Sequence, residues 1–116
     1  MAWDEGLAQL MRDDLAALPV TEKKMFGGLA FLLGGHMICG IHRGGAMFRV
    51  GKDRYAEALA IPGVTPMQMG DRVMNGMVDA GDDLMADEAR RGRLMAISLS
   101  AVQALPPKLA KPGKTR

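Results

Sequence analysis

The sequence predicts an α+β domain with an antiparallel sheet and a helix near each end of the chain. Two glycine pairs, Gly34 with Gly35 and Gly44 with Gly45, separate short apolar stretches. Two-residue hairpin turns need positive φ, which glycine adopts without steric cost. Near both ends, apolar residues recur every three or four positions, as they do on one face of a helix. With 116 residues, 48% of them hydrophobic, the chain is long enough for one core.

The N-terminal helix is predicted from an apolar stripe with acidic residues at its start. Asp4 and Glu5 lie where the helix dipole favours negative charge, and Pro19 ends the pattern. The stripe consists of Trp3, Leu7, Leu10, Met11, Leu15 and Leu18.

The middle of the chain is predicted to be extended. We expect strands over residues 23–33, 36–43 and 46–51, because these stretches are apolar and are bounded by the glycine pairs. A short helix over residues 53–61 follows, and Pro62 ends it. Residues 64–70 are expected to form a loop, residues 71–78 a fourth strand and residues 79–83 a turn.

A long C-terminal helix is predicted up to residue 105, with Asp83 or Asp87 as its cap. Pro106 and Pro107 stop it. Its apolar face carries Leu94, Ile97, Ala101, Val102 and Leu105. Residues 1–107 are therefore expected to form one domain, and residues 108–116 a basic flexible tail.

The charge of the chain argues against specific binding to nucleic acid. The net charge is +2, and four positive residues, Lys108, Lys111, Lys114 and Arg116, lie in the tail, so the body carries +2 − 4 = −2. A nucleic-acid-binding domain places its basic patch on a structured face. No apolar run approaches the ~20 residues of a membrane span. A signal peptide and a disulfide framework are also not indicated, so we expect a cytoplasmic protein that does not bind membranes.

Pairing the strands through their glycine turns predicts a sheet with two apolar faces. The face assigned to the core carries Phe26, Ala30, Leu32, Met37, Cys39, Ile41, Phe48 and Val50. The second face carries Met25, Leu29, Phe31, Leu33, Ile38 and Met47, with His42 and Arg49 among them.

The second face is the candidate site, because Gly27, Gly28 and Gly40 are expected to leave a shallow depression in it. The candidate ligand or interface residues are Gly27, Gly28, Phe31, Gly40, His42, Met47 and Arg49. A helix, a second copy of the chain in a homodimer, or a small ligand could cover this face.

Catalytic, metal and cofactor motifs are not found. The glycine-rich region leads into another strand, so a phosphate-binding loop with a following helix N-terminus is not formed. His36, His42 and Cys39 do not supply four convergent zinc ligands, and Cys39 is expected to be a buried structural residue. The basic stretch at residues 89–93 is expected to be a solvated helix face. We therefore expect no catalytic residues, no metal and no cofactor, and a protein that is not an enzyme.

Five strings of the sequence resemble the N-terminal domain of the TfoX/Sxy family. They are "KKMFGGLAFLLGGHMICGIH", "MFRVG", "ALAIPGVTPM", "VMNGMV" and "ALPPK", within residues 22–108. The resemblance implies a two-layer α+β sandwich similar to secretion-chaperone folds. Full-length members are regulators of natural competence with a second, C-terminal helical domain, which we expect to be missing here.

The resemblance implies a stand-alone regulatory or protein-interaction module, and it supplies no catalytic residues. The expected partner is another protein or a second copy of this chain. The alternative is a small-ligand-binding protein or an unrecognised enzyme that uses His42 and Arg49.

Overall fold

The computed structural model describes residues 4–25, 27–42 and 44–105. The helices are α1 (Glu5–Asp14), α2 (Tyr55–Leu59), α3 (Asp82–Ala86) and α4 (Glu88–Gln103). The strands are β1 (Thr21–Met25), β2 (Gly28–Leu33), β3 (His36–His42), β4 (Gly45–Arg49), β5 (Val64–Met69) and β6 (Arg72–Ala80). The six strands form one sheet in the order β1-β2-β3-β4-β6-β5, and all neighbours pair antiparallel.

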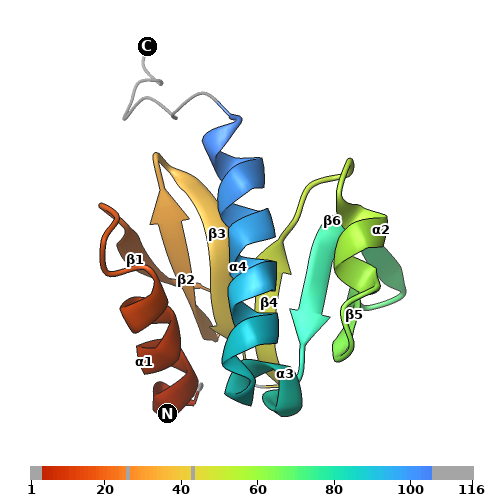
Figure 1. The fold of residues 1–116 in the computed structure, drawn as a ribbon, viewed down its shortest axis with the longest axis horizontal. Coiled ribbons are helices and arrows are strands. Elements are labelled where there is room, and N and C mark those ends of the chain that lie inside the picture. The colour runs from red at the N-terminus through yellow and green to blue at the C-terminus, as the bar shows by residue number, and fades with distance from the viewer. Residues whose placement is uncertain (1–3, 26, 43, 106–116) are drawn as a thin grey trace.

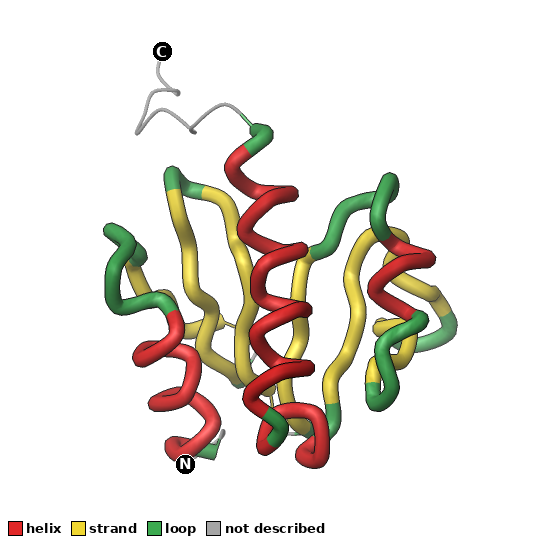
Figure 2. The backbone as a smooth tube through the Cα atoms, in the orientation of Figure 1, coloured by secondary structure: helices red, strands yellow, loops and turns green. Residues whose placement is uncertain are grey.

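The helices form one layer and the sheet forms the other. Helix α4 crosses β3 and β4, with α1 and α2 on either side of it, all on the same face of the sheet (Figure 1). The tube view shows the same arrangement, with the helices in front of the strands (Figure 2). The predicted two-layer α+β sandwich with an antiparallel sheet is therefore confirmed. No described helix covers the opposite face, which we call the open face.

Two regions of the sheet differ from the prediction. The single strand expected over residues 23–33 is a hairpin, because Gly27 has φ of +76° and turns the chain between β1 and β2. Residues 64–70, expected to be a loop, contain the edge strand β5. Pro66 lies in β5, which is permitted because an edge strand has one side without ladder hydrogen bonds.

The register of β2 against β3 corrects the predicted sheet faces. Leu29 pairs with Ile41 and Phe31 with Cys39, and the register then shifts by one residue at Leu32. Such a bulge adds a residue to one strand, and uniform pairing from the turn does not anticipate it. The helix-covered face consequently carries Leu29, Phe31, Ile38, Cys39, Ile41, Phe48 and Val50.

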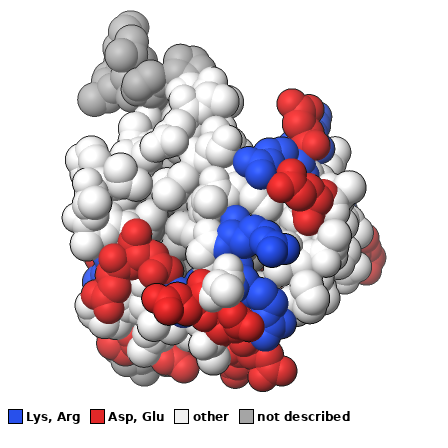
Figure 3. Space-filling model, viewed as in Figure 1, with Lys and Arg blue, Asp and Glu red and all other residues white. Residues whose placement is uncertain are grey.

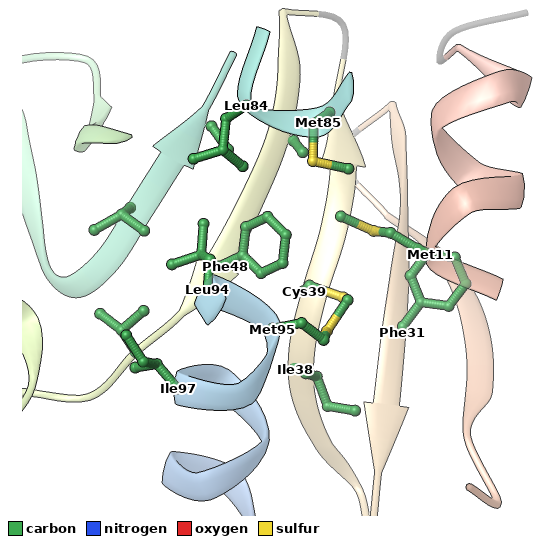
Figure 4. Close-up of a cluster of buried hydrophobic side chains, with 14 of the residues drawn as sticks. Met11, Phe31, Ile38, Cys39, Phe48, Leu84, Met85, Leu94, Met95 and Ile97 are labelled. Carbon is green, nitrogen blue, oxygen red and sulfur yellow. The ribbon is translucent and has the colours of Figure 1, made fainter. Parts of the chain in front are cut away.

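The core lies between this face and the helices. Side chains of α1, α3 and α4, including Met11, Leu84, Leu94 and Met95, pack on the sheet, where Met11 lies beside Phe31 and Leu94 beside Phe48 (Figure 4). Cys39 is fully buried, as expected for a structural thiol. Burial raises the pKa of the Cys39 thiol well above its ordinary value, so the thiolate is scarcely populated near neutral pH.

The helices begin at aspartate caps, and an ion pair joins α4 to α1. Asp4 and Asp87 accept hydrogen bonds from the first-turn N–H groups of α1 and α4, so Asp87 is the cap of the long helix. Arg91 Nε lies 2.7 Å from Asp14 Oδ2, and Arg91 Nη1 donates to the carbonyl oxygen of Met85 at 2.7 Å. The expectation of a fully solvated basic face at residues 89–93 is therefore wrong for Arg91, which is 7% exposed.

Several predictions fall on residues outside the described part of the chain. These are the contribution of Trp3 to α1, the place of Phe26 on the sheet, the helix stop at Pro106 and Pro107, and the tail at 108–116. Among the described residues, no helix is both long enough and apolar enough to cross a membrane.

Candidate binding site

A groove of about 870 Å³ extends along the open face of the sheet. Its lining comes from every strand of the sheet and, at one end, from Ala101 in the last turn of α4 and Leu105 just beyond the helix. Six methionines line it: Met25, Met37, Met47, Met67, Met74 and Met77. We call this feature the methionine groove. Its volume falls in the range of about 300–1,000 Å³ that is usual for ligand sites.

Strand alternation places these side chains together. Gly40 of β3 pairs with Met47 of β4, which in turn pairs with Asp79 of β6. Arg49 pairs with Met77, two residues further along the same two strands. Because residues i and i+2 of a strand point to the same face, these groups share the open face.

Glycine forms part of the groove where the strands approach most closely. A Cβ at Gly28 would overlap the carbonyl oxygen of Ile41. A Cβ at Gly40 would lie 2.8 Å from the Leu29 carbonyl oxygen and 2.8 Å from the Met47 methyl group, so Met47 folds over Gly40. The depression expected around Gly28 and Gly40 is therefore present, and methionine side chains line it.

Methionine gives the groove an adaptable apolar lining. The side chain is unbranched, has three rotatable bonds and carries a polarizable sulfur atom, so it adjusts to differently shaped partners. Met74 is 37% exposed and Leu105 is 38% exposed at the rim, whereas Met47 is 9% exposed. The groove therefore presents apolar side chains to a partner without forming a fully closed cavity.

His42 is held by hydrogen bonds on both ring nitrogens. The N–H of Gly44 donates to Nδ1 at 3.0 Å, so Nδ1 is unprotonated and Nε2 carries the proton. Nε2 then donates to Asp79 Oδ1 at 2.9 Å. The pair fastens the end of β3 to β6, and neither nitrogen is left to take a proton from a substrate.

Arg49 is a cation on the open face that forms no ion pair with a described residue. Its Nε atom is buried and has no hydrogen-bond partner among the described residues. No described carboxylate forms an ion pair with Arg49, and Asp79, the single acidic residue of the lining, bonds to His42. Lys52 adds a second cation to the groove. A buried donor without a partner costs about 1–3 kcal/mol, so this atom favours a ligand that can accept from it.

The structure brings together five of the seven candidate residues predicted from the sequence. Gly28, Gly40, His42, Met47 and Arg49 all line or underlie the groove. The other two lie elsewhere.

Gly27 is in the exposed turn before β2, and an added Cβ there would meet nothing within 4 Å. Phe31 is 1% exposed in the core on the opposite face, so its predicted place at an interface is wrong. The bulge in β3 is the reason, because it reverses the face that uniform pairing gives to Phe31.

Sequence reasoning missed the contribution of β5 and β6 to the site. The sequence predicts a turn at Asp79 and a loop at Met67, whereas the structure has both residues in strands. The signal that indicates a strand here is the alternation of Met77 and Asp79 with the buried Val78. In a strand with one buried face, every second residue is buried.

On the helix side, a hollow whose lining includes Arg12, Leu15 and Phe31 is smaller than the methionine groove, at about 260 Å³. On this side, acidic and basic side chains lie intermixed along the bottom and up the right of the view (Figure 3). Over the described part of the chain, no group of three or more His, Cys, Asp or Glu residues is placed to hold a metal ion.

Fold and groove together define an α+β structure whose helices cover one sheet face and whose other face carries a largely apolar groove. The family model described as the TfoX N-terminal domain matches residues 13–102, and the chain belongs to that family. The matched region includes every strand of the sheet and nearly all of α4. No curated protein and no solved structure gives a match.

Proposed function

We propose that this chain is a non-enzymatic, regulatory protein-interaction module, related to the competence regulators, that binds an apolar segment of a partner protein in the methionine groove. The observation that carries the proposal is the open sheet face lined by six methionines. Flexible methionine surfaces suit partners that present varied apolar side chains.

The chemistry of the described residues supports a binding role over a catalytic one. Both ring nitrogens of His42 are engaged within the protein. Cys39 is buried with a raised pKa, so it is a poor nucleophile. A nucleophile paired with a general base is therefore not formed by these residues.

The proposal is tested by site-specific photocrosslinking in the source cell. A photoreactive phenylalanine analogue at Met74 would place the probe at the groove rim, because this side chain is 37% exposed. The matched control carries the analogue at Ala56, which is exposed on α2 in the helix layer. We expect one partner protein to crosslink at position 74 and not at position 56.

A second variant checks that the groove itself makes the contact. Met77→Glu places a carboxylate among the apolar side chains of the lining and should abolish the crosslink at position 74. The proposal is wrong if positions 74 and 56 give the same products, or if the product at position 74 survives Met77→Glu in a folded protein.

A further inference from the structure

We propose that the methionine groove is also a binding site for small amphipathic monocarboxylates, with Arg49 as the anchor of the carboxylate. This inference does not depend on a protein partner. It concerns which soluble ligand the groove accepts, and a ligand held there would compete with a partner segment for the same surface.

The first argument is the mismatch between Arg49 and its surroundings. Nε of Arg49 is buried without a hydrogen-bond partner among the described residues. Its cross-strand neighbour is Met77, whose thioether side chain offers no oxygen acceptor. A guanidinium group binds a carboxylate through two parallel N–H···O hydrogen bonds, and such bonds are strongest where water is excluded.

The second argument is the charge of the whole lining. The cations are Arg49 and Lys52, and the one carboxylate, Asp79, lies 2.9 Å from His42 Nε2. The groove therefore holds an excess of positive charge and favours an anion. A cationic or neutral ligand of the same shape would leave Arg49 unmatched.

The third argument is the apolar remainder of the site. The remaining lining consists of methionine, glycine and aliphatic side chains, and the polar lining residues are His42, Arg49, Lys52, Gln68, Asn75 and Asp79. A ligand therefore needs an apolar body that packs against the thioethers and one acidic group that reaches Arg49. A fatty acid has this composition, whereas a phosphate ester of a sugar or a nucleotide would leave many polar groups without partners.

The experiment compares three probes that share one alkyl chain. Decanoate, 1-decanol and decyltrimethylammonium are titrated separately into the purified full chain, below their aggregation limits, by isothermal calorimetry. We expect decanoate to bind more tightly than 1-decanol, and decyltrimethylammonium to bind least. Loss of one charge-assisted hydrogen-bonding partner should weaken binding about tenfold or more. Arg49→Gln should therefore reduce the affinity for decanoate by that factor. The affinity for 1-decanol, which has no carboxylate, should stay unchanged.

Two controls separate an anchoring role from a structural one. Arg49→Lys keeps the charge but not the planar fork and should restore part of the affinity. Arg54→Gln removes a surface arginine that pairs with Glu57 outside the groove and should leave binding at the level of the unchanged protein.

Methionine methyl resonances report where the probe binds. In protein labelled with ¹³C at the methionine methyl groups, decanoate should shift Met47 and Met77, which line the groove. Met85 and Met95 are buried in the core on the other side of the sheet and should stay unchanged.

Three results would overturn the inference. Equal affinities for decanoate and 1-decanol, both insensitive to Arg49→Gln, would show that Arg49 is not an anchor. Preferential shifts of Met85 or Met95 would place the ligand outside the groove. Failure of decanoate to bind would refute the inference outright, and a dimer in solution whose contact protects Met47 would then show that a second copy occupies the face. Because these measurements use no partner protein, their failure would leave the crosslinking result intact, and the reverse also holds.

Discussion

Replacing Asp14 by alanine would remove the carboxylate that holds Arg91 between the two longest helices. Arg91 Nε lies 2.7 Å from Asp14 Oδ2, and Nη2 lies 3.4 Å from Oδ1. The Arg91 side chain is 9% exposed and the Asp14 side chain 24% exposed. The hydrogen bond to Asp14 raises the pKa of Arg91 above its ordinary value. The guanidinium stays charged even without this bond, because arginine is not deprotonated near neutral pH. The variant therefore keeps a buried cation that has lost its counter-ion.

The expected cost follows from this burial. Removing one partner of a fully buried pair costs about 3–5 kcal/mol. Because Asp14 is partly exposed, water can reach the vacated position, and we expect the smaller loss of about 2–3 kcal/mol in the free energy of unfolding. For a domain of this size the loss corresponds to a melting temperature lower by roughly 10 °C.

The effect is measured by urea denaturation, with circular dichroism as the signal. The proteins compared are Asp14→Ala, Arg91→Met and the double variant. Arg91→Met keeps an apolar stem in the same place and lets Asp14 hydrate, so it should cost about 1 kcal/mol. The double variant should be more stable than the sum of the single losses predicts, with a coupling energy of about 1–2 kcal/mol. An unchanged urea midpoint for Asp14→Ala, or a coupling energy of zero, would show that this ion pair does not stabilise the helix layer.

Further predictions concern the core, the thiol, the α4 cap and nucleic acid. Phe31→Glu should abolish the cooperative unfolding transition, because Phe31 is 1% exposed in the core; the matched Met77→Glu variant, on the open face, should stay folded by circular dichroism. Labelling of native Cys39 by a thiol reagent at pH 7 should be slow and should become fast in urea; rapid native labelling would contradict its burial. The pKa of Asp87 is lowered, first by its hydrogen bonds with Arg90, so its stabilising effect is present above its unfolded pKa of about 4 and is lost as the pH falls through the folded value. Asp87→Ala should therefore reduce the stability that is lost on acidification. If the free energy of unfolding of the variant falls with acid as steeply as that of the unchanged protein, Asp87 does not stabilise α4 as its cap. In gel-shift assays we expect no sequence-specific DNA binding that survives ~200 mM salt, and tight, salt-resistant binding to one sequence would refute this.

The sequence by itself determined the local elements whose signals are strong. The apolar stripes with aspartate near their starts predicted α1 and α4, because a helix needs both a buried face and acceptors for its first N–H groups. The glycine pair at Gly34 and Gly35 predicted the β2–β3 turn, where both residues have positive φ. Burial of Cys39 also followed from the sequence, since its assignment to the core face did not depend on the position of the bulge.

Only the tertiary structure decided which side chains share the open face. The extra residue in β3 reverses the faces of Leu29 and Phe31, and no local propensity specifies where a bulge falls. β5 is a strand because β6 supplies its ladder partners, and this pairing outweighs the weak strand propensity around Pro66. The His42–Asp79 pair joins residues 37 positions apart, so it exists only after β4 and β6 have paired. The Nε atom of Arg49 is likewise without a hydrogen-bond partner among the described residues because of its neighbours in space, which the sequence does not specify. This is the observation that makes Arg49 a candidate anchor.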